Sequence, residues 1–131
     1  MALERDFEKF TGGPVKATRD RMHVTLSPLS VIYLNQNTYR LLGNPAAAAL
    51  YYSREKDTIA IEPASPRIDE NFPLKPMQNG WRILAGPFVG NFGIRTDHTL
   101  RFVHPDIDNG ILLLSLRDTV NVTPRRYKKQ K

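Results

Sequence analysis

A ten-residue pattern that returns after fifty residues is the strongest constraint on the fold of this chain. The segments Leu34 to Gly43 and Leu84 to Gly93 both begin with Leu, place a large apolar residue next to last and end with Gly. Each copy follows an apolar stretch and precedes an extended stretch, a polar turn and a second apolar run. Internal similarity of this kind is typical of a fold built from related units. We therefore expect a single domain over residues 22–122, with related halves at 22–63 and 74–122 and a linker at 64–73.

Local patterns predict a mostly β fold with short helices. Asn35 is a favoured helix cap and Gly43 a left-handed stop, so a helix of about two turns is expected between them. In the second half, Pro87 suits a first helical turn, Phe88 and Phe92 share a helical face, and Gly93 ends the helix. The expected strands of the first half, from apolar alternation and β propensity, are residues 23–26, 31–34, 46–52 and 58–62.

Turn signals predict how the strands of the second half connect. Asn79-Gly80 is the strongest short hairpin signal in the chain and leads into a strand from Trp81 to Leu84. Residues 99–103 and 110–116 are expected to pair as a hairpin around 104–109, and 119–122 to extend the last strand. The segment from Pro63 to Pro73 holds too many prolines for a central strand, so it is interpreted as the connector.

Composition limits the class of protein. The chain has 131 residues, of which 40% are hydrophobic, so it can bury a core of its own. It has no cysteine, which excludes disulfides, thiolate zinc sites and a cysteine nucleophile. No apolar run approaches the roughly 18 residues of a membrane span, and no signal-peptide pattern opens the chain, so we expect a cytoplasmic protein with no membrane association.

The positive charge of the chain is concentrated in its C-terminal tail. The formal net charge is +6, yet residues 22–116 hold eight basic and eight acidic side chains, whereas residues 117–131 hold six basic and one acidic. We interpret residues 123–131 as a basic tail that follows the domain. Lys and Arg bound to phosphates supply most nucleic-acid affinity. The alternative is a solvated tail that confers solubility. The candidate nucleic-acid contacts, from the tail and from cations that the fold could gather beside it, are Arg19, Arg21, Lys75, Arg82, Arg125, Arg126, Lys128 and Lys129.

The order of strand, short helix ending in Leu-Gly, strand, charged hairpin and strand resembles the AbrB/SpoVT family of swapped-hairpin domains. The stretches that carry the resemblance are Val24-Thr25-Leu26, Ile32-Tyr33-Leu34, Leu41-Leu42-Gly43 and Ile59-Ala60-Ile61-Glu62-Pro63. It covers Met22 to Pro63 and, more loosely, Leu74 to Val122. In that family two such halves interlock into one small β-barrel, and the related MraZ-type proteins carry both halves in tandem. The resemblance implies a swapped-hairpin β-barrel and a DNA-binding transcriptional regulator with double-stranded DNA as its partner.

This chain departs from the family where the family's turn into the first Ile-Leu strand is basic or contains glycine. Here that turn reads Pro28-Leu29-Ser30. An alternative function is therefore a protein-binding or self-associating scaffold, a homodimer or higher oligomer, which keeps the barrel without binding DNA. Its contacts would be the neutral aromatic body and an N-terminal arm, residues 1–21, in which Leu3, Phe7 and Phe10 fall on one face of a short helix.

Catalytic and metal patterns are weak, so no enzyme activity, cofactor or metal is expected. His98 and His104, with Asp97 and Asp106 nearby, match no compact ligand motif. Residues 106–110 echo a calcium loop, but the position of its bidentate Glu is Arg117. No phosphate loop or nucleophile elbow is present. The aromatic side chains are interpreted as core or subunit contact rather than as a ligand platform.

Overall fold

The computed structural model describes residues 21–122, which form two antiparallel β-sheets and two short helices. Sheet A has the strand order β11-β8-β1-β2-β7-β6, and sheet B has the order β5-β3-β4-β10-β9. The strands of sheet A, in chain order, are β1 (Val24–Leu26), β2 (Val31–Asn35), β6 (Lys75–Met77), β7 (Gly80–Leu84), β8 (Leu100–Phe102) and β11 (Thr119–Asn121). Those of sheet B are β3 (Ala47–Ser53), β4 (Thr58–Ala64), β5 (Phe72–Pro73), β9 (Asp106–Asp108) and β10 (Ile111–Ser115).

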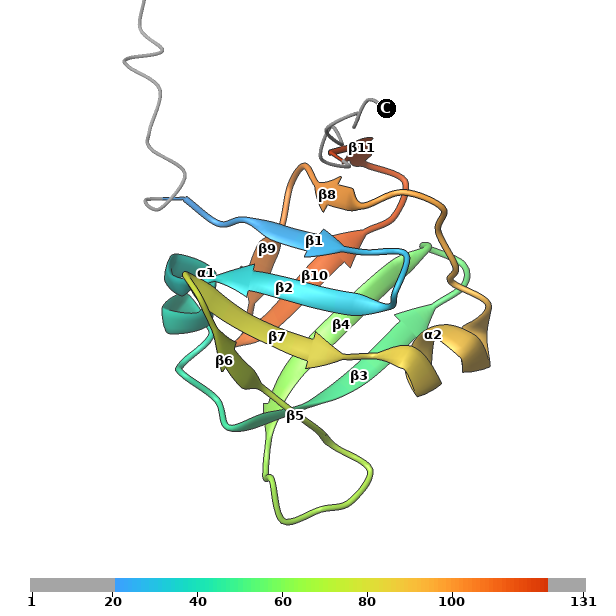
Figure 1. Cartoon of the computed structure of the whole chain (residues 1–131). Helices are drawn as coiled ribbons and strands as arrows, with labels where there is room; N and C mark the ends of the chain where they lie inside the picture. Colours follow the sequence, from blue (N-terminus) through green and yellow to red (C-terminus); the bar gives the residue numbers. More distant parts are fainter. Residues whose placement is uncertain (1–20, 123–131) are drawn as a thin grey trace, which may run out of the picture.

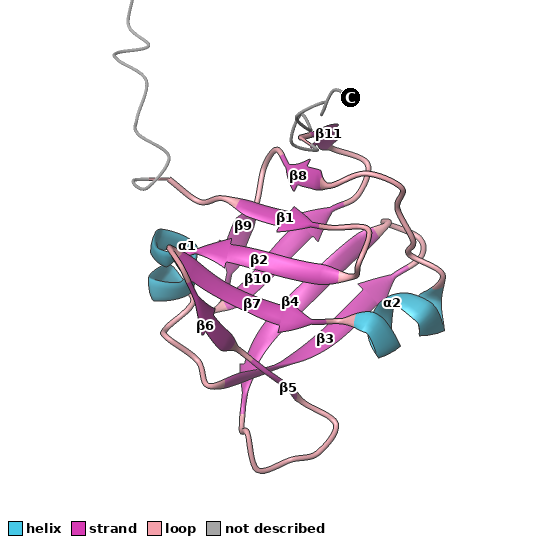
Figure 2. Ribbon diagram, in the orientation of Figure 1, coloured by secondary structure: helices cyan, strands magenta, loops and turns pink. Residues whose placement is uncertain are grey.

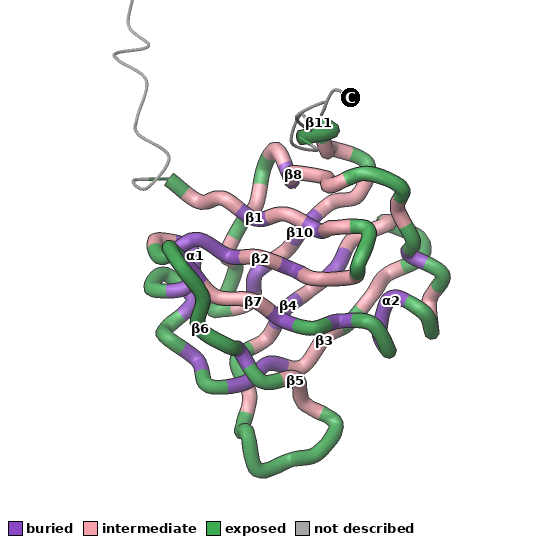
Figure 3. The backbone as a smooth tube through the Cα atoms, in the orientation of Figure 1, coloured by how far each residue is buried: buried purple, intermediate pink, exposed green. Residues whose placement is uncertain are grey.

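The two sheets pack face to face, and their strands cross steeply (Figure 1; Figure 2). Burial alternates along the strands, as two-residue side-chain periodicity requires (Figure 3). The residues at the centre of the core are fully buried and come from both sheets: Val24, Leu26, Ile32, Leu34, Ile59, Ile61, Ile83, Leu112 and Leu114. Their burial is the main favourable contribution to folding, at about 25 cal/mol per Å² of apolar surface.

The chain passes from one sheet to the other at sharp corners. Leu74, which is buried, joins β5 of sheet B to β6 of sheet A, and its amide donates to the Ala46 carbonyl at 3.0 Å. Residues 103–105 carry the chain from β8 to β9, and residues 116–118 carry it from β10 to β11. Strands that change sheets at bends are typical of orthogonal sheet packing. The hydrogen bonds between strands do not connect the two edge strands of either sheet, so both sheets are open. No closed barrel is found among residues 21–122.

The first helix, α1 (Gln36–Leu41), begins and ends where its punctuation predicts. The Asn35 side chain accepts a hydrogen bond from the Thr38 amide at 3.0 Å, and Gly43 follows the helix with a φ of 99°. Tyr39 packs its ring on Trp81 of β7, with centroids 4.1 Å apart, and donates its hydroxyl to the Pro45 carbonyl at 2.7 Å. A helix this short persists because it packs on the sheet.

The second helix, α2 (Gly86–Phe92), also follows its pattern. Pro87 lies in the first turn, and Gly93 ends the helix in the left-handed region with a φ of 67°. The rings of Phe88 and Phe92 meet edge to face at 5.3 Å. The helices lie at opposite ends of β2 and β7 (Figure 1). Neither helix in the described range 21–122 is long and apolar enough to cross a bilayer.

The predicted strands and mostly β class are confirmed, but the predicted hairpin between 99–103 and 110–116 is wrong. β8 lies in sheet A and pairs with β1 and β11, whereas β10 lies in sheet B and pairs with β9 and β4. The hairpin is formed by β9 and β10 around Asn109 and Gly110, which both have positive φ. Residues 119–121 accordingly form the separate strand β11 of sheet A rather than an extension of β10.

Three finer expectations also need correction. The linker is shorter than predicted, because Pro63 lies within β4, beyond the residues paired with β10, and Pro73 lies in the edge strand β5. At the Asn79-Gly80 turn, Asn79 takes the positive φ and Gly80 is already the first residue of β7.

The repeat does not place Leu34 and Leu84 equivalently, since Leu34 is fully buried and Leu84 is exposed. The predicted N-terminal helix lies outside the described residues.

Candidate nucleic-acid interface

The register of sheet A places six side chains side by side on its solvent face. Because Val24, Leu26, Ile32, Leu34 and Ile83 point into the core, the residues between them point outward. Paired positions link these outward residues from strand to strand. With strands about 4.8 Å apart, the row spans the sheet over about 24 Å. We call the set the outer row, and from β6 to β11 it comprises Lys75, Arg82, Tyr33, Thr25, Arg101 and Val120.

The outer row is positively charged. Lys75, Arg82 and Arg101 belong to it, and Arg21 lies just before β1. Among residues 21–122, the only ion pair joins His104 to Asp118, so no described carboxylate neutralises these cations at contact distance. The Nε atom of Arg82 is buried without a hydrogen-bond partner among the described residues. Cations without carboxylate partners are suited to binding phosphate groups.

Tyr33 lies at the middle of the outer row in a defined position. Its hydroxyl donates to the Asn79 carbonyl at 2.8 Å. Its ring lies over Gly80, where an added Cβ would come within 2.6 Å of a ring carbon. The His23 ring approaches its edge at a centroid distance of 6.1 Å. Partial burial raises the pKa of Tyr33 above its usual value, so this hydroxyl stays protonated and donates.

A cleft of about 610 Å³ opens at the β8 end of the outer row. Burial lowers the pKa of His23 on its wall, and the positive charges of Arg101 and Arg21 lower it further. The imidazole is therefore neutral at physiological pH, and the guanidinium groups carry the positive charge. The cleft is lined by Arg21, Met22, His23, Arg101, Val103, His104, Pro105 and Asp106.

The solvent face of sheet B has the opposite character. Tyr51, Ala60, Leu113 and Asp106 follow one another in register across its strands, pointing away from the core. Glu62 and Asp108 lie two residues along their strands from Ala60 and Asp106, so both add a carboxylate to this face. The Tyr51 hydroxyl donates to a Glu62 carboxylate oxygen at 2.8 Å, and this bond raises the pKa of Tyr51. The strands of sheet B therefore present carboxylates to solvent where those of sheet A present cations, and Lys56 of the turn between β3 and β4 borders the same face of sheet B.

The predicted cations are partly brought together. Lys75 and Arg82 are direct neighbours in the outer row, and Arg21 lines the adjoining cleft. The remaining predicted contacts lie outside the described residues: Arg19, Arg125, Arg126, Lys128 and Lys129.

Sequence reasoning missed Arg101 and assigned Tyr33 to the core or a subunit contact. Tyr33 is partly exposed, as is Arg101. The signal that could have identified both is alternation. Arg101 stands between Leu100 and Phe102, and Tyr33 between Ile32 and Leu34, so each points away from an apolar face.

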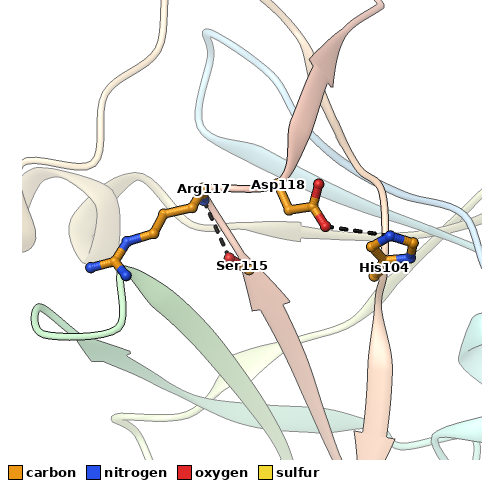
Figure 4. Close-up of polar contacts among 4 residues, drawn as sticks. All are labelled: His104, Ser115, Arg117 and Asp118. Carbon is orange, nitrogen blue, oxygen red and sulfur yellow. Dashed lines mark hydrogen bonds and ion pairs between the residues drawn. The ribbon is translucent and has the colours of Figure 1, made fainter.

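The histidines and carboxylates considered for a metal do not assemble. No group of three or more potential ligands is found among the described residues. His104 Nε2 lies 3.5 Å from the Asp118 carboxylate, and both side chains are exposed (Figure 4). Arg117, at the position of the missing calcium ligand, donates its amide to Ser115 Oγ and its guanidinium to the Glu55 carbonyl.

Comparisons of the chain with protein-family models, with curated proteins and with solved structures found no match. The functional assignment therefore rests on the geometry and charge of the two sheet faces.

Proposed function

We propose that this chain is a non-enzymatic, DNA-binding regulator that contacts the DNA backbone through the outer row of sheet A. The observation that carries the proposal is the alignment of Lys75, Arg82 and Arg101 on one face without carboxylate partners among the described residues. Such cations release counterions from DNA when they bind phosphates, and this supplies affinity that does not depend on sequence. The basic C-terminal residues, at the end of the chain that follows β11, would add to the same interaction.

The proposal includes kinship with the swapped-hairpin family. Strands β2 and β7 each lead into a helix, and they pair with each other across the halves. Strands β4 and β10, which are each the second strand of a hairpin in their half, also pair with each other. Pairing of corresponding strands is what interlocked halves of a barrel would give. The DNA-contacting surface would differ from the family's, because the turn into β2 is not basic and the sheet face is.

Salt-dependent binding tests the proposal. Labelled DNA, offered as a duplex and as its separated strands, is titrated with the full chain and with a form ending at Val122, and anisotropy is recorded over a range of salt concentrations. We expect Lys75→Gln, Arg82→Gln and Arg101→Gln each to weaken binding, and each lost phosphate contact to reduce the slope of log K against log salt by about 1.

The matched control is Arg67→Gln, which removes an exposed cation from the loop between β4 and β5. It should leave both affinity and slope unchanged. Absence of binding by the full chain to either form of DNA at low salt would overturn the proposal. If removal of residues 123–131 abolishes binding and the sheet substitutions have no effect, the DNA interface is the tail and not the sheet.

A scaffold function is the second candidate, favoured by an apolar corner on the same sheet. Leu29, in the turn between β1 and β2, is 86% exposed, and Leu84 is 46% exposed opposite Val31. Sedimentation velocity of the wild type and of Leu29→Ser/Leu84→Ser tests this candidate. Self-association that the double substitution abolishes would support it, and a wild type that stays monomeric at high concentration would count against it.

A further inference from the structure

We infer that the outer row of sheet A receives an unpaired DNA strand rather than a duplex, with Tyr33 as the platform on which a base stacks. The inference rests on the DNA-binding function proposed above and names the form of DNA that this surface fits. It follows from the width of the charged surface, from the character of the helices and from the way in which Tyr33 is held.

The charged surface is too broad for a groove of double-stranded DNA. From Lys75 on β6 to Arg101 on β8 the row crosses five strands, a distance of about 19 Å. The major groove is about 12 Å wide and admits one helix or a two-stranded ribbon. The ribbon of β6 and β7 could enter it, but its tip, Met77 to Asn79, carries no charge.

The helices do not supply a basic recognition surface either. The one cation of α1 is Arg40, which donates to the Asn37 side chain of the same helix. Helix α2 contains no charged residue. Lys75, Arg82 and Arg101 instead lie in register on the solvent face of sheet A, and a basic surface of this kind can follow the backbone of a single strand.

Tyr33 has a defined orientation for stacking on a base. The hydroxyl bond to the Asn79 carbonyl and the contact of the ring with Gly80 define its orientation before any ligand binds. Arg82 is its direct neighbour on β7, and Arg101 lies beyond Thr25 on the other side. A base on the ring would thus have a cation on each side for the flanking phosphates. Aromatic stacking platforms between backbone-binding cations are the usual means of holding an unpaired strand.

The test compares one oligonucleotide with its own duplex, using Tyr33→Leu and Tyr33→Phe. We expect the wild type to prefer the unpaired strand, and Tyr33→Leu to weaken that binding about tenfold, the size of one lost base stack. Tyr33→Phe, which keeps the ring and loses the bond to Asn79, should lose much less. Neither substitution should change binding of the duplex, whereas Arg82→Gln should weaken both.

A second measurement uses the unaltered protein, so that it does not depend on the folding of a variant. A strand of abasic nucleotides has the same phosphates but no base to stack, and we expect the wild type to bind it about tenfold more weakly than the normal strand. Equal affinity for the two strands, or tighter binding of the duplex, would overturn the inference while leaving the proposed function standing. Failure of the full chain to bind any of these DNAs would overturn the proposed function itself.

Discussion

At the scale of single residues, Gly80 stands at a position of β7 where β2 leaves no room for a side chain. An added Cβ would lie 2.4 Å from the Leu34 carbonyl oxygen and 2.6 Å from the Tyr33 ring. We expect Gly80→Ala to lower the free energy of unfolding by about 1–3 kcal/mol, because the crowding forces the strands to shift. Urea denaturation measures the change.

The control for this substitution is Gly90→Ala in α2, where nothing lies within 4 Å of an added Cβ. Alanine is the better helix former, so this change should raise the free energy of unfolding by up to about 1 kcal/mol. If Gly80→Ala were as stable as Gly90→Ala, the close contact between β2 and β7 would be wrong.

His23 makes stability depend on pH. Burial, then Arg101 and Arg21, lower its pKa in the folded protein, so the unfolded chain binds the proton more readily. The stabilisation is complete above the unfolded pKa of about 6.5 and is lost as the pH falls below it. We expect the urea midpoint to fall between pH 7 and pH 5, and to fall less in His23→Gln. The matched control is His98→Gln, which removes an exposed histidine instead. If the stability of His23→Gln depended on pH as strongly as that of the wild type, His23 would not be the source of the pH dependence.

At the scale of elements, α1 depends on its stacking against β7. The Tyr39 and Trp81 rings lie nearly parallel, and the Tyr39 hydroxyl binds the Pro45 carbonyl beyond the helix. We expect Trp81→Ala to lower the free energy of unfolding by about 2–4 kcal/mol, through lost burial and a lost aromatic pair.

The matched substitution is Tyr39→Phe, which keeps the stacked rings and removes only the hydrogen bond to Pro45. It should lower the free energy of unfolding by about 1 kcal/mol. Near-ultraviolet circular dichroism should report loss of the stacked pair in Trp81→Ala only. Similar losses of stability in the two variants would show that the hydroxyl bond, and not the stack, holds the helix.

At the scale of the whole molecule, neither half contains a complete sheet. Strand β1 of the first half pairs with β8 of the second, β2 pairs with β7, and β4 pairs with β10. We expect the fragments 21–63 and 64–122 each to remain unfolded alone and to regain β structure when mixed, because each leaves the apolar face of the other uncovered. Circular dichroism of the separate and mixed fragments tests this. Cooperative unfolding of the first fragment alone would contradict it.

Short-range features of the fold were predictable because they depend on neighbouring residues. The cap at Asn35 and the left-handed ends at Gly43 and Gly93 involve groups within about one helical turn. The alternation of Val24 and Leu26 around Thr25 likewise sets which face of β1 is buried, whichever strand lies beside it. The sequence alone therefore determined the type and approximate bounds of most elements. Among the candidate cations it also named Lys75 and Arg82, two of the three that the structure aligns in the outer row.

Strand partners were decided only by the tertiary structure. The segments that form β8 and β10 looked like the arms of one hairpin, but each buries its apolar side chains in a different sheet, and the bend between them contains Pro105. Arg101 joins Arg82 and Lys75 in one row only once β8 is placed beside β1 and β2 beside β7. A pattern of alternation tells which way a side chain points, but the partners of a strand depend on burying the whole core at once, and that long-range choice created the charged face.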